Sequence, residues 1–201
     1  HLLKGIGQID DTVFMRSFSA LWIAIGIYRH RVSPFLQPEE VRFLMDRLLV
    51  FYENDLDVRG FIDTKGWAHG AAHGADALDE FARCSETGAP DLMRILEALR
   101  GKAMNGSYGY VHQEDERMVT AVTAVLERGM LDETWLATWI SGFGHMTLTG
   151  SQPHDVVLRV NITHFLRSLA YRLQKPAQAG IGGAARVVAE VTRVLHQIDT
   201  F

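Results

Sequence analysis

The chain has 201 residues, of which 47% are hydrophobic and 22% are charged, so it is long enough to bury the core of one domain and short for two. Its formal net charge of -4 gives no general attraction to nucleic acids or to anionic membranes, and no run of lysine and arginine forms a basic stripe. We therefore expect one domain over residues 1–201, without a nucleic-acid partner or a membrane partner.

The sequence also predicts the cellular setting. The longest apolar run, residues 20–28, is too short to span a bilayer, and the start of the chain does not have the pattern of a signal peptide. The single cysteine, Cys84, excludes an internal disulfide and is predicted to be a passive thiol in a soluble, cytoplasmic protein. Because the chain begins with His1 rather than Met, we expect it to be the C-terminal bulk of a longer protein.

Helical periodicity extends over almost the whole chain. Acidic residues or prolines precede several of the apolar repeats, as is typical of helix starts. A connector is expected between Glu53 and Thr64. The predicted helices cover approximately residues 11–32, 38–51, 66–82, 90–101, 115–128, 135–140, 153–173 and 187–195.

The expected fold class is all-α. No stretch alternates convincingly between polar and apolar residues, so strand should be essentially absent. About eight helices joined by short loops predict antiparallel pairs stacked as a HEAT-like helical array or solenoid, although no internal sequence repeat is found. The residues expected to be buried include Phe14, Phe18, Leu21, Trp67, Leu78, Phe165 and Leu169.

The segment from Gly66 to Asp76 carries the most specific functional signal. If it is helical and continues to Glu80, then His69, His73, Asp76 and Glu80 lie in one line, within one narrow arc of its surface. Imidazole nitrogens and carboxylate oxygens at this spacing can bind a divalent metal, zinc or similar. The alternative is a solvated helix face or a metal-free, hydrogen-bonded histidine cluster.

Other residues are candidates to complete such a site. His164 is favoured as a further metal ligand over His112, His145 and His154. Metal-assisted hydrolysis would need a general base, and Glu80 and Glu116 are the candidate catalytic residues. The acidic run 114–116 could supply a missing metal ligand or a general base, but capping of a helix amino end is the preferred explanation of these acids.

Glycines recur every fourth residue beside the histidines, at Gly66, Gly70 and Gly74. Each glycine inside a helix costs about 1 kcal/mol relative to alanine. Either a ligand approaches the backbone closely in a crevice, or another helix packs tightly there. The crevice is expected to be walled by the helices that carry Arg16 and His164.

Arginines are the second group of candidate site residues. A cluster of guanidinium groups binds phosphate or carboxylate, which predicts a small polar or anionic ligand. The alternative is internal ion pairing of Arg16, Arg59 and Arg117 with nearby acids, which would leave these arginines largely buried. The candidate ligand-binding residues are Arg16, Arg59, Trp67, Arg117 and Arg167.

Several segments together resemble an uncharacterised bacterial family, a domain of unknown function. The matching stretches are residues 11–20, 55–61, the 66–76 motif, residues 114–117, and Asn161 with residues 165–169. The resemblance implies an all-helical, array-like fold and relatives that continue further on the N-terminal side. It implies no reaction. This sequence departs from the family pattern at Gly70 and Gly74.

Two functional hypotheses follow from the sequence. The first is a helical-array protein whose His/Asp site binds a divalent metal or a small ligand, with metal-assisted hydrolysis as the reaction class. The second is a non-enzymatic module that binds a protein partner on a concave helical surface.

Overall fold

The computed structural model describes residues 1–198, and within them the fold is all-α, as predicted. Eight α-helices carry almost all of the regular structure of these residues, together with a hairpin of two short strands. In chain order the elements are α1 (Thr12–Val32), α2 (Pro38–Asn54), β1 (Phe61–Ile62), β2 (Gly66–Trp67), α3 (Gly70–Ala82), α4 (Ala89–Ala103), α5 (Glu114–Glu127), α6 (Glu133–Ser141), η1 (Gly142–His145), α7 (His154–Leu173), η2 (Pro176–Gln178) and α8 (Ala184–Ile198).

Local capping sets the starts of several helices. The side chain of Asp10 accepts a hydrogen bond from the amide of Thr12 at 2.9 Å, and that of Asp132 accepts one from Thr134 at 2.8 Å. Pro38, whose fixed φ suits a first helical position, opens α2. These contacts satisfy backbone amides that have no partner within the helix.

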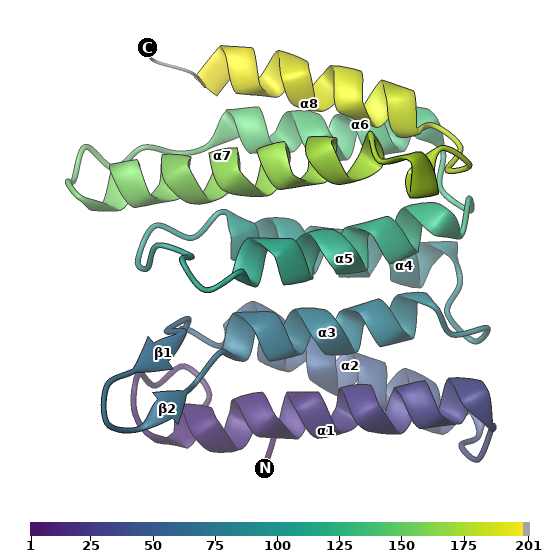
Figure 1. The fold of residues 1–201 in the computed structure, drawn as a ribbon. Coiled ribbons are helices and arrows are strands. Elements are labelled where there is room, and N and C mark those ends of the chain that lie inside the picture. Colours follow the sequence, from purple (N-terminus) through teal and green to yellow (C-terminus); the bar gives the residue numbers. More distant parts are fainter. Residues whose placement is uncertain (199–201) are drawn as a thin grey trace.

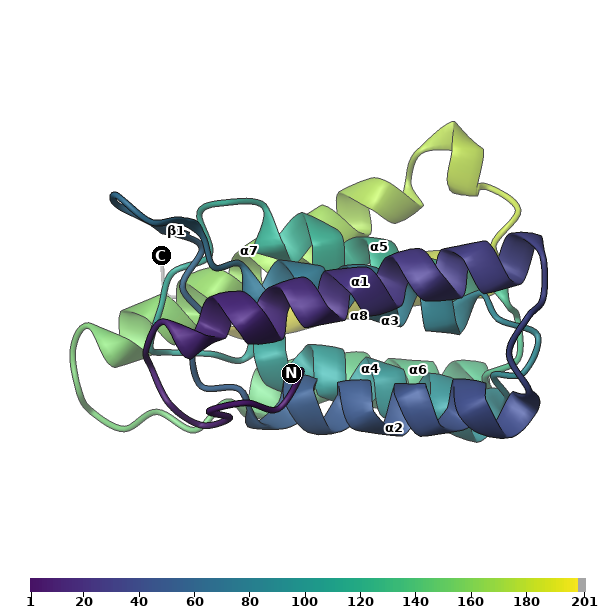
Figure 2. The same ribbon diagram turned by 90° about the horizontal axis from the view of Figure 1, so that it is seen from below.

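The helices form two layers of stacked pairs (Figures 1 and 2). One layer contains α1, α3, α5 and α7, each packed on the next, and the other contains α2, α4 and α6. The last helix, α8, packs against both α6 and α7. The amino ends of α1, α3, α5 and α7 lie on the same side of the stack (Figure 1). A repeated superhelical array stays a prediction.

The core lies between these layers, and the expected core residues divide into two groups. Leu78, Phe165 and Leu169 are fully buried, as predicted, whereas Phe14 and Leu21 are only partly buried. The prediction was wrong for Phe18 and Trp67, whose exposed fractions are 44% and 46%.

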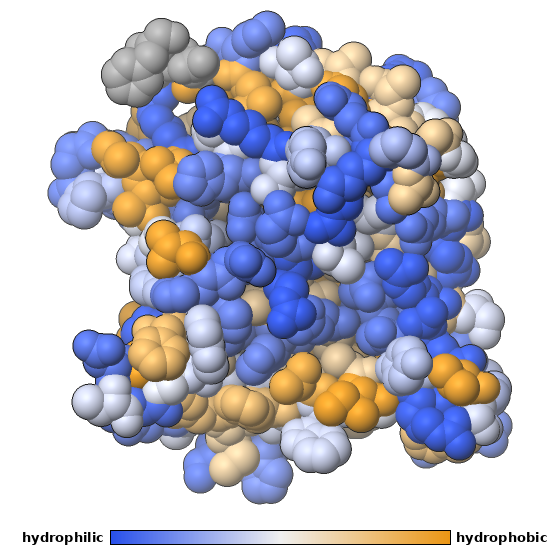
Figure 3. Space-filling view, viewed as in Figure 1, coloured by the Kyte–Doolittle hydropathy of each residue, from blue (hydrophilic) through white to orange (hydrophobic). Residues whose placement is uncertain are grey.

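Exposed apolar side chains gather on α1. In Figure 3 the face over α3 and α5 is mostly hydrophilic, while apolar residues form a row along the lower edge, over α1. Phe18 belongs to this outer face of α1. Trp67 is exposed for a different reason, because it lies in a strand and not on a helical core stripe.

The hairpin replaces the first turn of the predicted histidine helix. Phe61 pairs with Trp67 and Ile62 pairs with Gly66, where φ is 95° and favours glycine. The rings of Phe61 and Trp67 meet edge to face, with centroids 5.1 Å apart. Each strand has only two residues, too few to produce a visible alternation in the sequence.

An ion pair buried beside α1 joins three segments of the chain. Arg16 has no exposed surface, and its Nη2 and Nε donate to the two carboxylate oxygens of Asp55 at 2.9 and 3.2 Å. The same guanidinium donates to the carbonyl oxygens of Lys4, Gly5 and Gln8, each at 3.0 Å. The pair therefore fixes the first residues of the chain and the segment after α2 against α1.

Lys102 extends this network from α4. Its Nζ donates to the carbonyl oxygen of Asp55 at 2.8 Å and lies over the ring of Tyr52. Burial lowers the pKa of Lys102 to about 8, although Asp55 and Glu53 oppose the shift. A charged group at this depth is tolerated because a carbonyl and a ring face partly replace water.

Tight helix packing explains the glycine at position 74. A Cβ atom on Gly74 would lie 2.3 Å from Cδ2 of Tyr52, on α2. Tyr52 has no exposed surface and donates to the carbonyl oxygen of Ala71 at 3.2 Å, so its ring cannot move aside freely. Of the two alternatives for these glycines, close approach of a helix applies at Gly74.

Among residues 1–198, no helix combines the length and the apolar character that crossing a membrane requires.

Replacing Arg16 with alanine should lower the free energy of unfolding by about 3–5 kcal/mol, because it leaves the buried carboxylate of Asp55 without a partner. Urea denaturation measures the change. Arg42→Ala, which removes an exposed arginine of α2, is the control and should change stability by less than about 0.5 kcal/mol. Equal effects of the two variants would contradict the assigned role of the pair.

Gly74→Ala should lower the free energy of unfolding by about 1–3 kcal/mol, because the new methyl group overlaps the ring of Tyr52. Gly101→Ala is the matched control, since Gly101 is an exposed glycine of α4 with no atom within 4 Å of its Cβ position. The control should raise stability by about 0.4–1 kcal/mol. Thermal or chemical denaturation should therefore show a lower stability for Gly74→Ala and a higher stability for Gly101→Ala. If both changes raised stability, position 74 would not be tightly packed.

Candidate functional site

The histidine motif lies where β2 meets α3, at the side of the stack that holds the amino ends of α3 and α5 (Figure 1). His69 is the N-cap residue of α3 and has a left-handed backbone, with φ 54°. Its amide donates to the carbonyl oxygen of Arg59 at 3.0 Å and so continues the hairpin. The predicted helical line from His69 to Glu80 was therefore wrong for its first member, and only His73, Asp76 and Glu80 lie in the helix.

His69 is enclosed by aromatic rings and by polar atoms from the loop before α5. Its ring stacks on Trp67 with centroids 4.8 Å apart, and its edge contacts His73 at 5.6 Å. Its Nε2 lies 3.2 Å from the carbonyl oxygen of His112 and 3.4 Å from Oε1 of Glu114. Residues far apart in the sequence thus meet around one imidazole.

Glu114, the first residue of α5, has no exposed surface. Its Oε2 accepts a hydrogen bond from the amide of His112 at 2.8 Å, whereas its Oε1 is buried without a hydrogen bond. Burial acts to raise the pKa of Glu114, but the nearby His69 side chain and the amides of Glu114 and His112 outweigh it and lower the pKa. The carboxylate is therefore charged at neutral pH, beside a helix amino end that favours negative charge.

The absence of a side chain at Gly60 makes room for this carboxylate. A Cβ atom there would lie 2.6 Å from Oε1 of Glu114 and 2.3 Å from Nδ1 of His112. His112 is partly exposed, with its Nδ1 3.7 Å from Oε1 of Glu114. The cluster formed by His69, His112 and Glu114 is called the His/Glu cluster below.

His73 lies behind His69, toward α1. It is 8% exposed, and its Nδ1 has no hydrogen-bond partner. Phe18 packs edge-on against its ring, with centroids 5.2 Å apart. Burial lowers the pKa of His73 to about 4, and His69 and Arg117 contribute in the same direction. The imidazole is therefore neutral at physiological pH.

Asp76 is engaged by an arginine. Arg117 donates to its Oδ1 at 3.0 Å, and burial raises the pKa of Asp76 although Arg117 opposes the shift. The predicted carboxylate partner of Arg117 is confirmed. Its predicted burial was wrong, since the side chain is 47% exposed and reaches Asp76 from the surface of α5.

The two candidate general bases lie in other ion pairs. Glu80 pairs with Arg31 of α1. Glu116 accepts from Arg172 of α7 at 2.6 Å. Burial acts to raise the pKa of Glu116, but the nearby side chains of Ser168 and Arg172 outweigh it and lower the pKa. Catalytic roles for Glu80 and Glu116 stay predictions.

The other predicted ligand-binding arginines differ in their surroundings. Arg16 is buried against Asp55, as expected. Arg59 donates from Nε to Asp57 at 2.8 Å, which confirms the predicted carboxylate partner, and its side chain is partly buried, with 32% exposed. Arg16 and Arg59 therefore form internal ion pairs, which was the alternative to binding an anionic ligand.

His164 and Arg167 lie away from the His/Glu cluster. Both are exposed on α7 and line a cavity of about 700 Å³ between α7 and α8, with Val160 and Leu195 among its apolar residues. The expectation that the helix of His164 would form a wall beside His69 and His73 was wrong, because α5 lies between α3 and α7.

No three histidine, cysteine, aspartate or glutamate side chains of residues 1–198 are already arranged as a group that could hold a metal ion. The predicted ligands are separated by their surroundings: His73 faces Phe18, Asp76 faces Arg117, and His164 lies on α7. A divalent metal at His69, His73 and Asp76 stays a prediction.

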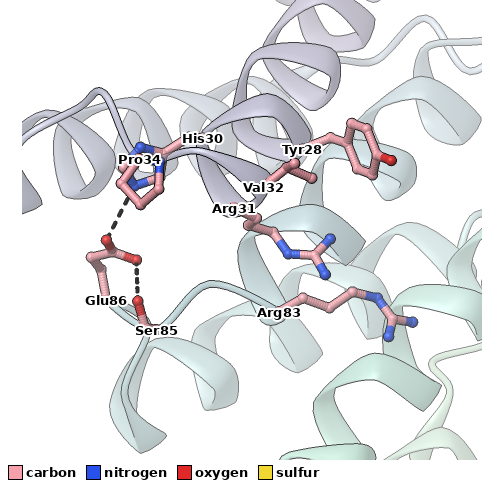
Figure 4. Close-up of a pocket in the computed structure, with 8 residues that line it drawn as sticks. All are labelled: Tyr28, His30, Arg31, Val32, Pro34, Arg83, Ser85 and Glu86. Carbon is pink, nitrogen blue, oxygen red and sulfur yellow. Dashed lines mark hydrogen bonds and ion pairs between the residues drawn. The ribbon is translucent and has the colours of Figure 1, made fainter.

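A second polar pocket, of about 290 Å³, lies at the carboxyl ends of α1 and α3 (Figure 4). On one side of it, His30 and Ser85 bond to the carboxylate of Glu86 at 3.1 and 3.0 Å. On the other side Arg31 and Arg83 extend together (Figure 4), and each is paired with acids outside the pocket. The charged side chains that line this pocket are therefore already paired within the protein.

Cys84 lies next to this pocket and is buried. Burial raises the pKa of its thiol to about 12, and Glu86 adds to the shift. The predicted passive thiol agrees with this environment, because the thiolate is the reactive form.

His112 and Glu114 were missed as the main partners of His69, although both were among the weaker candidates. A signal was present in the sequence: a histidine two residues before an acid at a helix start, after a loop rich in glycine and tyrosine. Helix capping was the preferred explanation of the acid, and its approach to His69 depends on how α5 packs on α3.

His73 should make stability depend on pH. The unfolded chain takes up a proton at His73 as the pH falls through about 6.5, whereas the folded chain does so only near 4. The contribution of His73 to the free energy of unfolding is therefore complete above pH 6.5 and is lost between pH 6.5 and 4. Relative to His73→Gln, the unmodified chain should lose about 2–3 kcal/mol more over this range.

Chemical denaturation at a series of pH values, with a metal chelator present, measures this loss. His196→Gln, which removes an exposed histidine of α8, is the control and should keep the pH profile of the unmodified chain. An unchanged profile in His73→Gln would contradict the assignment.

The comparison with known proteins gives a family and no function. No curated protein and no solved structure matches the chain. A family model described as "Protein of unknown function (DUF2785)" matches residues 2–171, which include the hairpin, the His/Glu cluster and most of α7. The chain therefore belongs to this family, and the resemblance found in the sequence to a domain of unknown function is confirmed.

Proposed function

We propose that this domain binds a divalent metal ion, zinc or similar, in the His/Glu cluster, with Oε1 of Glu114, Nε2 of His69 and Nδ1 of His112 as ligands. The observation that carries the proposal is the environment of Glu114. Its Oε1 is fully buried and has no hydrogen bond, yet imidazole nitrogens lie 3.4 and 3.7 Å away. A buried charged oxygen without a donor is costly, and an ion is one of the few groups small enough to satisfy it there.

The spacing supports the same proposal. Around a tetrahedral ion with bonds of about 2.0–2.1 Å, neighbouring ligand atoms are about 3.3 Å apart. The separation between Glu114 and His69 is already close to this value, and that between Glu114 and His112 is a few tenths of an ångström longer. A small rotation of the partly exposed His112 would bring its nitrogen into range.

The surrounding contacts suit metal ligands held in fixed orientations. The amide of His112 donates to Oε2 of Glu114 and leaves Oε1 for the ion. Trp67 stacks on His69 and restricts the rotation of that ring. A metal at Nε2 of His69 requires the tautomer that carries its proton on Nδ1.

In this arrangement His73 supports the site without binding the ion. Its ring packs between His69 and Phe18 and keeps water from the inner side of the cluster. The half-exposed Trp67 offers a flat surface beside the cluster to a small polar or anionic ligand. If the domain is an enzyme, metal-assisted hydrolysis stays the predicted reaction class, in which the ion held by the three proposed ligands would activate a water molecule.

Calorimetric titration of the chelator-treated protein with Zn²⁺ tests the proposal, and Co²⁺ absorption reports the coordination geometry. We expect one ion per chain. Glu114→Gln and His112→Ala should weaken binding by at least about 100-fold, the upper end of the losses seen when even a supporting residue is removed. His73→Phe should keep one ion per chain.

His164→Ala, which removes an exposed histidine of α7, is the matched control and should bind as the unmodified chain does. Circular dichroism should confirm that every variant is folded. Loss of the ion in His73→Phe with retention in Glu114→Gln would favour the ligand set inferred from the sequence alone. Failure of the unmodified chain to bind Zn²⁺ or Co²⁺ would refute a metal site.

A further inference from the structure

Helix α1 is apolar on two opposite faces. Its inner face, with Val13, Ala20, Ala24 and Ile27, is buried against the rest of the domain. Its outer face carries larger apolar side chains that remain exposed. The exposed fractions are 43% for Met15, 44% for Phe18, 71% for Trp22 and 49% for Ile25. A helix that is apolar all round is normally buried on all sides.

The outer residues follow a regular spacing. Met15, Phe18, Trp22 and Ile25 are separated by three, four and three positions, the spacing at which one helix packs along another. Figure 2 shows α1 and α2 as the outermost helices at this end of the stack. Gly26 lies beside the row, and its Cβ position has no atom within 4 Å, so another helix can approach there closely.

We propose that this row is an interface with a second copy of the chain, in which α1 packs antiparallel to α1 of the partner. An antiparallel register that places Met15 opposite Ile25 of the other copy also places Phe18 opposite Trp22. Because the pair has two-fold symmetry, each of these contacts occurs twice in the dimer. Large apolar side chains then cover one another along the whole row.

Charge complementarity favours a second copy as the occupant. The register that pairs the apolar residues also places Asp11 of each copy opposite Arg29 of the other. Both side chains are exposed. Asp11 accepts from Nζ of Lys65 at 2.7 and 2.8 Å within its own chain, whereas among residues 1–198 no carboxylate pairs with Arg29. A parallel arrangement would instead place like charges together at each end of the helix.

The interface would be independent of the proposed metal site, although the two are neighbours. Phe18, which belongs to the row, contacts the ring of His73. A partner helix packed on Phe18 would therefore lie close to the ring of His73. None of the three proposed metal ligands belongs to the row.

Sedimentation equilibrium over a range of protein concentrations tests the interface. The unmodified chain should form a dimer with about twice the 22.5 kDa mass of one chain. Trp22→Asp should weaken association by at least about 30-fold, which corresponds to the loss of one central hot-spot residue. Tyr171→Asp is the matched control, because Tyr171 is a 66% exposed aromatic residue on α7, and it should leave the dimer unchanged.

A charge exchange tests the orientation. Asp11→Arg alone should weaken the dimer, since it places two positive charges at each end of the interface. Adding Arg29→Asp in the same chain should restore association, because in the antiparallel register each new charge meets its opposite. In a parallel pair the exchange would restore nothing.

The outcomes separate clearly. Trp22 is exposed in the single chain, so Trp22→Asp should keep the circular dichroism spectrum of the folded domain. A monomer at all concentrations would overturn the proposal. A dimer that Trp22→Asp leaves intact, or one whose charge exchange is not rescued, would overturn it as well.

Discussion

Arg16 has no access to water, and the rest of the structure around the site depends on its pairing with Asp55. The guanidinium fixes the start of the chain, while the backbone oxygen of Asp55 accepts from Lys102 on α4. One carboxylate residue therefore connects α1, α2 and α4. Its position decides where the chain leaves α2, and hence where the hairpin places His69 above α3. Asp55 is thus connected to the His/Glu cluster through the backbone of residues 56–69.

Most of the fold could be predicted because its determinants are local. Apolar periodicity and capping residues identified the eight helices, and Pro38 opens α2 where it was expected, whereas α6 begins at Glu133, before its predicted start at residue 135. The hairpin could not be predicted. Its strands are too short to alternate, and its stability comes from the cross-strand contact of Phe61 with Trp67. Strand propensity and hydrophobic periodicity describe single segments, so they do not reveal a contact between two strands.

The candidate site could be predicted only in part, because helical geometry relates residues within one segment. The motif identified His69 and His73 as neighbours, and their rings do touch. The approach of Glu114 and His112 depends on how α5 packs on α3, and the separation of His164 from the motif depends on the order of helices in the layer. Arg117 found its expected partner while remaining exposed, since pairing requires reach but not burial.

At two positions beside the His/Glu cluster, the backbone conformation that shapes the site also lowers the stability of the domain. His69 and Gln113 both have left-handed φ values, 54° and 66°, which side chains other than glycine adopt at a cost. Each residue immediately precedes a helix, α3 or α5, and turns the chain so that the cluster closes. A glycine at position 113 would relieve this strain and free the loop that holds His112. Selection for a more stable domain would therefore tend to loosen this corner of the molecule.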